Sequence, residues 1–450
     1  LVDYACGRYA SPEHDISYTH LELTDTLIPR SAVPIKSASF GSSTGSCQMF
    51  PSTSRSCQIF PSVYDREDED ITGDELTIHG VKVVNKTSHS SNTPQATIPL
   101  VMLHGYANGC VYFYRNLISL SQTYFPTIYA LDMLGFGLSS RPRFETTPDD
   151  TSVESAEAFF VESLEAWRIK NKIDKMIIAG HSIGGYMSVA YAEKYPERVE
   201  RLILISPVGV PDSSTNNFAA HVKTLPFTKG MTLKTIRYLF DKGFTPSMVL
   251  RSMPGSQSKQ LVLAYVERRL PTIDCPEEQS VFADYLHQSA MLRGSGEHCL
   301  SRILTLNPGA YAKKPLLYRI PRLNVNSVHF LIGQNDWVDV EGGLDVQSLC
   351  SKRRTDGLFS PQINVYGIRD AGHLLMIDNP YEFNSALIMA GGGEHALSSN
   401  APRPRQFDYL GTNHESFFRE SQLKAQRSKE QQSIKDIKED TKSSPVTISQ

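Results

Sequence analysis

The stretch Met176–Gly185 (MIIAGHSIGG) joins an apolar run to a serine that is flanked by glycines. The apolar run predicts a buried strand that ends at Gly180, and apolar residues at helical spacing follow from Tyr186 to Lys194. The unit is therefore a strand, a sharp turn and a helix. The turn carries the pattern Gly-x-Ser-x-Gly with Ser182 at its centre, and this strand–turn–helix context distinguishes a nucleophile elbow from a chance match.

The elbow has direct chemical consequences for Ser182. Glycines around the serine predict a turn that is too tight for side chains, with the serine hydroxyl projecting over the edge of the sheet. The helix that follows would begin with free backbone N–H groups and the positive end of its dipole beside that hydroxyl. Ser182 is therefore the candidate nucleophile, and the backbone N–H of Ile183 is a candidate oxyanion donor.

Apolar strands alternate with amphipathic helices on both sides of the elbow. This alternation predicts an α/β fold with a mostly parallel sheet covered by helices on both faces. Ligands bind outside the carboxyl ends of the strands in such sheets, so residues that follow strands should converge there. The predicted strands are 98–103, 127–131, 175–179, 201–205, 328–332 and 363–366, after a hairpin within 76–84, and the predicted helices are 111–121, 153–170 and 381–389.

The strand–helix alternation also divides the chain. Residues 1–74 are rich in Ser, Pro and Thr and predict a flexible N-terminal arm. Residues 75–390 predict the folded domain, and the alternation stops between about 211 and 326, which indicates a helical cap inserted over the sheet. Residues 391–450 are polar and predict a disordered tail.

Composition and charge argue against several classes of function. A formal net charge of −3 argues against a nucleic-acid partner. The seven cysteines include no C-x-x-C pair, which indicates a reducing, intracellular compartment and no zinc site. No apolar run approaches the roughly 20 residues of a membrane-spanning helix, so we expect a soluble or peripheral protein. The sequence begins at Leu1, and a targeting segment is neither assigned nor excluded.

A serine nucleophile needs a base and an acid that orients the base. The expected chain order is serine, acid, histidine. Asp336 is the first carboxylate after the strand 328–332, with Asp339 as the alternative. His373 follows the last predicted strand and is the candidate base. We expect no metal and no dissociable cofactor.

A second oxyanion donor is predicted at the end of the strand 98–103, where His104 and Gly105 lead to Tyr106. The backbone N–H of Tyr106 is the expected partner of the Ile183 N–H. Structural roles are favoured for His104 and for His181, and Asp132 is assigned to a turn.

These motifs resemble the α/β-hydrolase fold. Phe160–Arg168 (FVESLEAWR), Arg293–Glu297 (RGSGE) and His373–Asp378 (HLLMID) resemble its phospholipase/acyltransferase branch. That branch includes the fungal mitochondrial cardiolipin-specific deacylase, lysophosphatidic acid acyltransferases and the comparative-gene-identification lipase coactivator. The coactivator lacks the nucleophilic serine, whereas Ser182 is present here, which favours an active enzyme. The resemblance implies a peripheral membrane protein of the mitochondrion.

The resemblance implies a phospholipid or lysophospholipid substrate and a serine hydrolase that cleaves acyl esters of glycerophospholipids through an acyl-enzyme on Ser182. One alternative is a lysophosphatidic acid acyltransferase that uses the His-x4-Asp motif of His373 and Asp378. For Asp378 we favour a structural role, because Asn379 and Glu382 predict a helix start directly after it. The other alternative is a non-catalytic scaffold that binds lipid or a lipase.

The cap contains a segment that suits a membrane surface. Residues 221–244 interleave lysines with large apolar residues, as interfacial helices do, so we expect contact with anionic lipid. The alternative is a helix that packs on its own domain. Helices are predicted at His221–Phe240 and Lys259–Leu270.

Overall fold

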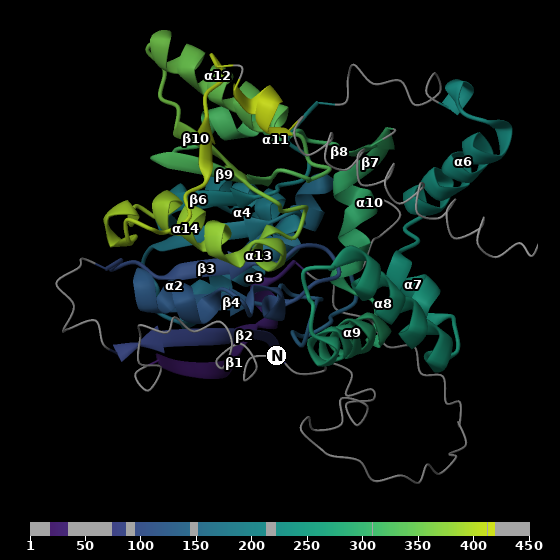
Figure 1. Cartoon of the computed structure of the whole chain (residues 1–450). Helices are drawn as coiled ribbons and strands as arrows, with labels where there is room; N and C mark the ends of the chain where they lie inside the picture. The colour runs from purple at the N-terminus through teal and green to yellow at the C-terminus, as the bar shows by residue number, and fades with distance from the viewer. Residues whose placement is uncertain are drawn as a thin grey trace, which may run out of the picture.

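The computed structural model describes residues 19–34, 74–86, 95–144, 152–212, 222–307, 309–411 and 413–418. A nine-stranded sheet runs through the molecule in the order β1-β2-β4-β3-β5-β6-β9-β10-β11 (Figure 1). The six strands from β4 to β10 in this order are parallel, and β1, β2 and β11 pair antiparallel with their neighbours. The predicted α/β class is confirmed. The strands are β1 (Thr19–Pro29), β2 (Glu75–Asn85), β3 (Leu100–Leu103), β4 (Thr127–Leu131), β5 (Met176–His181), β6 (Val199–Ile205), β9 (Ser327–Gly333), β10 (Gln362–Ile368) and β11 (Arg405–Phe407).

Helices cover both faces of the sheet, because the apolar side chains of each parallel strand alternate between two cores. Val101 and Leu103 of β3 belong to the core that also contains residues of α3 (Val153–Lys170), α4 (Ile183–Lys194) and α12 (Glu341–Thr355). Leu100 and Met102 face the opposite core, with α2 (Leu117–Thr123) and α14 (Pro380–Ala390). Helix α3 has the predicted bounds, and the predicted cap Ser152 accepts a hydrogen bond from the Ser155 N–H.

Two predicted elements near the start of the domain differ from the structure. The hairpin expected within 76–84 is one strand, β2, because Gly80 lies in the ladder rather than in a turn. A Cβ atom at Gly80 would lie 2.7 Å from the Ala130 carbonyl oxygen, so the glycine permits close approach of β4. The helix expected at 111–121 is divided into a 3-10 turn (Cys110–Phe113) and α2.

Part of the predicted flexible arm is folded. Strand β1 pairs with β2 along its whole length, from Thr19 opposite Asn85 to Pro29 opposite Glu75, and Ile28 is buried. The prediction of a flexible arm is therefore wrong for residues 19–34. Composition hid this strand because it lies at the sheet edge, with Leu23 and Leu27 exposed. The rest of the arm, residues 1–18 and 35–73, lies outside the described residues.

The segment between β6 and β9 forms the predicted cap. It is mainly helical, as expected, but it also contains a small hairpin of β7 (Leu304–Asn307) and β8 (Gly309–Ala312) that the sequence did not predict. Figure 1 shows α6 set apart from α7, α8 and α9. None of the described helices is long and apolar enough to cross a membrane. The cap helices are α6 (Phe227–Asp241), α7 (Pro246–Arg251), α8 (Gly255–Arg269), α9 (Pro276–Met291), α10 (Leu300–Ile303) and α11 (Leu316–Arg319).

The predicted disordered tail is also partly folded. Strand β11 pairs with β10, and Phe407 and Phe417 are buried. Gly367 of β10 leaves room for them, because a Cβ atom there would lie 2.6 Å from the Phe407 ring. The prediction of disorder is therefore wrong for residues 391–411 and 413–418, because Phe407 and Phe417 pack this segment against the sheet. Residues 419–450 lie outside the described residues.

Candidate active site

Ser182 occupies the turn between β5 and α4, with φ 55° and ψ −116°. This positive φ is strained for a residue with a side chain, and such strain is concentrated at functional sites. The flanking positions must be glycine because there is no room for a Cβ atom at either of them. A Cβ atom at Gly180 would lie 2.4 Å from the Gly184 carbonyl oxygen, and one at Gly184 would lie 2.5 Å from the His104 carbonyl oxygen. The predicted elbow is therefore present.

The three predicted triad residues are brought together from three strand ends. His373 Nε2 lies 3.1 Å from Ser182 Oγ, and His373 Nδ1 lies 3.0 Å from Asp336 Oδ1. The alternative acid, Asp339, instead accepts a hydrogen bond from the Glu341 N–H at the start of α12. The contacts favour Asp336 over Asp339, and the catalytic role of the three residues remains a prediction.

Backbone hydrogen bonds fix the two loops that carry acid and base. The N–H of Gln334 donates to the Ile368 carbonyl, and the N–H of Asn335 donates to the Ala371 carbonyl, both at 2.8 Å. The Asp336 side chain is fully buried between these loops, and its Oδ1 also accepts the Val338 N–H. The separation between Asp336 and His373 is therefore set by backbone, which is stiffer than side chains.

The predicted oxyanion donors lie on two elements that touch. Ile183 is the first residue of α4, where backbone N–H groups have no earlier helical acceptor. Tyr106 follows Gly105, and a Cβ atom at Gly105 would lie 3.2 Å from Ser182 Cβ. The loop after β3 therefore packs against the elbow, and donation by these two N–H groups remains a prediction.

His104 has the structural role that the sequence favoured. Its Nδ1 lies 2.7 Å from the Gly105 carbonyl oxygen, and its Nε2 accepts a hydrogen bond from the Met133 N–H. One ring nitrogen therefore donates and the other accepts, which is the pattern of a neutral imidazole. Burial lowers the pKa of His104, in agreement with that neutral form.

Asp132 also supports a turn. Its Oδ1 accepts the Cys110 N–H at 2.6 Å, and its Oδ2 accepts the Leu138 N–H at 2.8 Å. Together with His79 and Cys110 it forms a group of potential metal-binding atoms that lie within 4.8 Å of one another. Because both carboxylate oxygens already accept backbone N–H groups, we assign the group to fold stability.

Asp378 is positioned by the base loop and the cap. Its Oδ2 accepts the Gly372 N–H at 2.8 Å, and its Oδ1 accepts the Thr272 hydroxyl at 3.3 Å. Burial raises the pKa of Asp378. The predicted helix start is confirmed directly after it, because Asn379 Oδ1 accepts the N–H of Glu382. These contacts fit the structural interpretation, and a role in acyl transfer remains an alternative.

The stretch Arg293–Glu297 was singled out in the sequence only because it resembles the phospholipase/acyltransferase branch. In the structure it contacts other segments of the cap. The Glu297 carboxylate accepts hydrogen bonds from Arg251 and from the Thr245 hydroxyl. A Cβ atom at Gly296 would lie 2.7 Å from the Phe136 ring, so this segment also packs closely on the turn after β4. These contacts connect α7 and its N-cap residue Thr245 to the turn after β4.

Sequence reasoning missed Trp337. Its ring centroid lies 4.8 Å from that of His373, and 54% of the residue is exposed. Trp337 therefore lies against the candidate base while facing solvent. No local sequence pattern indicates this contact, because it joins two separate loops.

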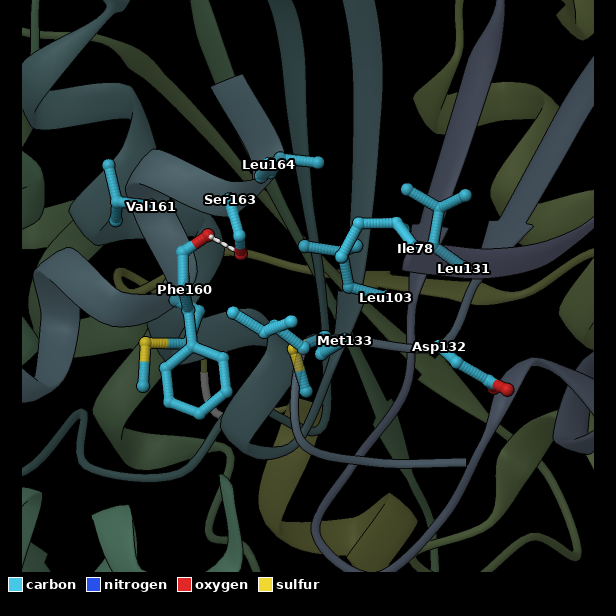
Figure 2. A pocket seen from close by; sticks show the side chains of 11 residues that line it. Ile78, Leu103, Leu131, Asp132, Met133, Phe160, Val161, Ser163 and Leu164 are labelled. Carbon is cyan, nitrogen blue, oxygen red and sulfur yellow. Dashed lines mark hydrogen bonds between the residues drawn. The ribbon is translucent and has the colours of Figure 1, made fainter. Parts of the chain in front are cut away.

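A small cavity lies between the sheet and α3. Figure 2 shows Leu103, Leu131 and Phe160 around it, with the Ser163 hydroxyl bonded to the Phe160 carbonyl. The space open to a water-sized molecule is about 20 Å³. Since that is about the space for one water, the cavity does not accommodate an acyl chain in this conformation.

The match to a family model agrees with this architecture. Residues 98–380 match the family model described as "alpha/beta hydrolase fold". A protein of Oryza sativa subsp. japonica, named "Probable 1-acylglycerol-3-phosphate O-acyltransferase", is 31% identical over an alignment of 310 residues that covers 66% of this chain and 70% of that protein. "1-acylglycerol-3-phosphate O-acyltransferase ABHD5" of Rattus norvegicus is 32% identical over an alignment of 302 residues, which covers 65% of this chain and 77% of that protein. The solved structure of a membrane phospholipase A is 20% identical, covering 72% of this chain and 84% of that chain, with a TM-score of 0.46.

Proposed function

Because the chain belongs to the α/β-hydrolase fold family, we propose that it is a serine hydrolase that cleaves acyl esters of glycerophospholipids. The observation that carries this proposal is the continuous contact from Ser182 through His373 to Asp336, with distances of 3.1 and 3.0 Å. The names of the sequence relatives support a lipid substrate. Deacylation of a cardiolipin-like lipid at the mitochondrion is the finer proposal that the motif resemblance favours.

The geometry supports an acyl-enzyme mechanism. His373 Nε2 removes the proton of the Ser182 hydroxyl as its oxygen attacks the ester carbonyl. Asp336 holds the imidazole through Nδ1, and the N–H groups of Tyr106 and Ile183 stabilise the oxyanion. The protonated His373 then gives its proton to the departing alkoxide, which leaves as an alcohol. An acyl-Ser182 ester remains.

The acyl-enzyme has two possible acceptors. Water gives hydrolysis, with His373 acting again as base, whereas the hydroxyl of a lysophospholipid gives acyl transfer. The second outcome is favoured by the relatives that are named 1-acylglycerol-3-phosphate O-acyltransferases. Both outcomes of this route pass through Ser182, whereas the alternative acyltransferase would use the His-x4-Asp motif of His373 and Asp378.

Helix α6 supports the proposal that the cap contacts a membrane. Of its residues only Gly230 is buried, although the helix carries many apolar side chains. Phe227 is 84% exposed and Ile236 is 50% exposed, so these apolar side chains remain largely uncovered, although Phe240 of the same helix packs against the core. Lys229 and Lys234 add positive charge beside them. This combination suits an anionic lipid surface, from which the substrate would enter the site.

A fluorophosphonate probe tests the catalytic proposal, because it reacts with an activated serine. We expect the full chain to be labelled and the Ser182→Ala variant to remain unlabelled. Folded wild-type protein that resists labelling would instead favour the non-catalytic scaffold. Unlabelled enzyme should then be assayed on phospholipid vesicles with and without lysophosphatidic acid, which separates hydrolysis from acyl transfer.

A further inference from the structure

His181, which directly precedes Ser182, makes a contact that its packing role does not require. The residue is 1% exposed, and its Nε2 lies 2.8 Å from the backbone carbonyl oxygen of His373. The two imidazole rings also lie close together, with centroids 4.9 Å apart. The residue before the candidate nucleophile is therefore bonded to the backbone of the candidate base.

The protonation state of His181 follows from its surroundings. A carbonyl oxygen only accepts, so Nε2 must carry the hydrogen. Nδ1 is buried and has no hydrogen-bond partner among the described residues. It faces Gly105, where a Cβ atom would lie 2.7 Å away. A second proton on Nδ1 would be buried without an acceptor, so His181 stays neutral.

We propose that His181 is a positioning residue that fixes His373 relative to Ser182. Its Nε2–H holds the peptide of His373, while its ring supports the neighbouring imidazole. The bond joins the elbow to the backbone of the loop that carries His373, in addition to the side-chain contact between Ser182 and His373 and the backbone bonds to the loop of Asp336. This inference rests on the proposed catalytic role of Ser182 and His373.

Neutrality is part of this positioning. His373 becomes an imidazolium when it takes the serine proton, and a charged neighbour 4.9 Å away would oppose that step. A lysine or arginine at position 181 would supply the donor but also the repulsive charge. A buried neutral imidazole supplies the donor alone.

The test compares two amide side chains that differ in reach. In His181→Gln the amide nitrogen reaches the place of Nε2, whereas in His181→Asn it reaches only the place of Nδ1. We expect His181→Gln to keep fluorophosphonate labelling within about threefold of wild type. We expect His181→Asn and His181→Phe to lose about 10- to 100-fold in labelling rate and in kcat, because small displacements of a catalytic group have effects of this size. KM for a soluble short-chain ester should stay unchanged, because His181 is buried behind the elbow with 1% of its surface exposed.

The outcomes separate the two proposals. Wild-type protein that is not labelled overturns the serine mechanism, and the inference falls with it. Normal wild-type labelling with equal rates in the Gln and Asn variants overturns the positioning role alone. Thermal denaturation confirms that each variant is folded. If the Phe variant does not fold, the Gln and Asn pair still decides the question.

Discussion

Replacing Asp378 distinguishes a structural carboxylate from a catalytic one. The structure gives Asp378 two hydrogen bonds, from the Gly372 N–H at 2.8 Å and from the Thr272 hydroxyl at 3.3 Å. Asp378→Ala removes both and leaves the Gly372 N–H without its acceptor, which should cost about 1–3 kcal/mol of stability. Asp378→Asn keeps an acceptor oxygen, so its cost should be below about 1 kcal/mol.

The pH dependence of this difference follows from burial. Burial raises the pKa of Asp378, so the ionised carboxylate is less favourable in the folded protein than in the unfolded chain. Its contribution to stability is complete below the ordinary pKa near 4 and is lost as the pH rises through the raised folded-state pKa. Asp378→Asn has no such loss. The variant should therefore gain stability relative to wild type as the pH rises through that window, which thermal denaturation at several pH values measures.

Activity assays complete the Asp378 test. Under the structural interpretation, Asp378→Asn retains both ester hydrolysis and transfer to lysophosphatidic acid. Asp378→Ala reduces both together, because displacement of the Gly372 loop moves His373. Thr272→Val is the matched control that removes the cap contact alone and should be milder. Selective loss of transfer in Asp378→Asn, with hydrolysis intact, would refute the structural interpretation and assign the His-x4-Asp motif to acyl transfer.

Two further predictions concern the acid and the cap. Asp336→Asn should lower kcat by about 10⁴-fold, because the imidazole of His373 would adopt the wrong tautomer. Asp339→Asn should change kcat little. The reverse result in a kinetic assay would show that the acid is misassigned. Lys229→Glu with Lys234→Glu should weaken binding to anionic vesicles by at least about 30-fold, since each lysine contributes about 1 kcal/mol, while soluble-ester activity is unchanged. A flotation assay measures vesicle binding, with Lys352→Glu on α12 as the control. Unaltered binding by the double variant would show that α6 is not the membrane contact.

The sequence predicted elements whose signals are local. The elbow was predicted because strand, glycines, serine and helix lie within one short stretch, and the bounds of α3 followed from its cap and its apolar spacing. The helix start at Asn379 was predicted for the same reason. In each case the residues that determine the conformation are neighbours in the chain.

Elements that depend on distant partners were missed. β1 and β11 each become strands by pairing with a strand already in the sheet, and their own composition is too polar to indicate this. The contact between Trp337 and His373 joins two loops, so no local pattern predicts it. The exposure of the apolar residues of α6 could not be predicted either, because an apolar helix face in a sequence does not show whether protein or lipid covers it.

The order of the candidate triad could be predicted although its geometry could not. Chain order places an acid and a histidine after strand ends, and parallel strands bring those ends to one edge. The 3.0 Å contact between Asp336 and His373 requires more, namely backbone bonds between their loops. Gln334 extends this connection outward, because its side chain donates to the Phe417 carbonyl and accepts the Asp370 N–H. The segment that composition placed in a disordered tail is therefore attached to the two loops that hold the candidate acid and base.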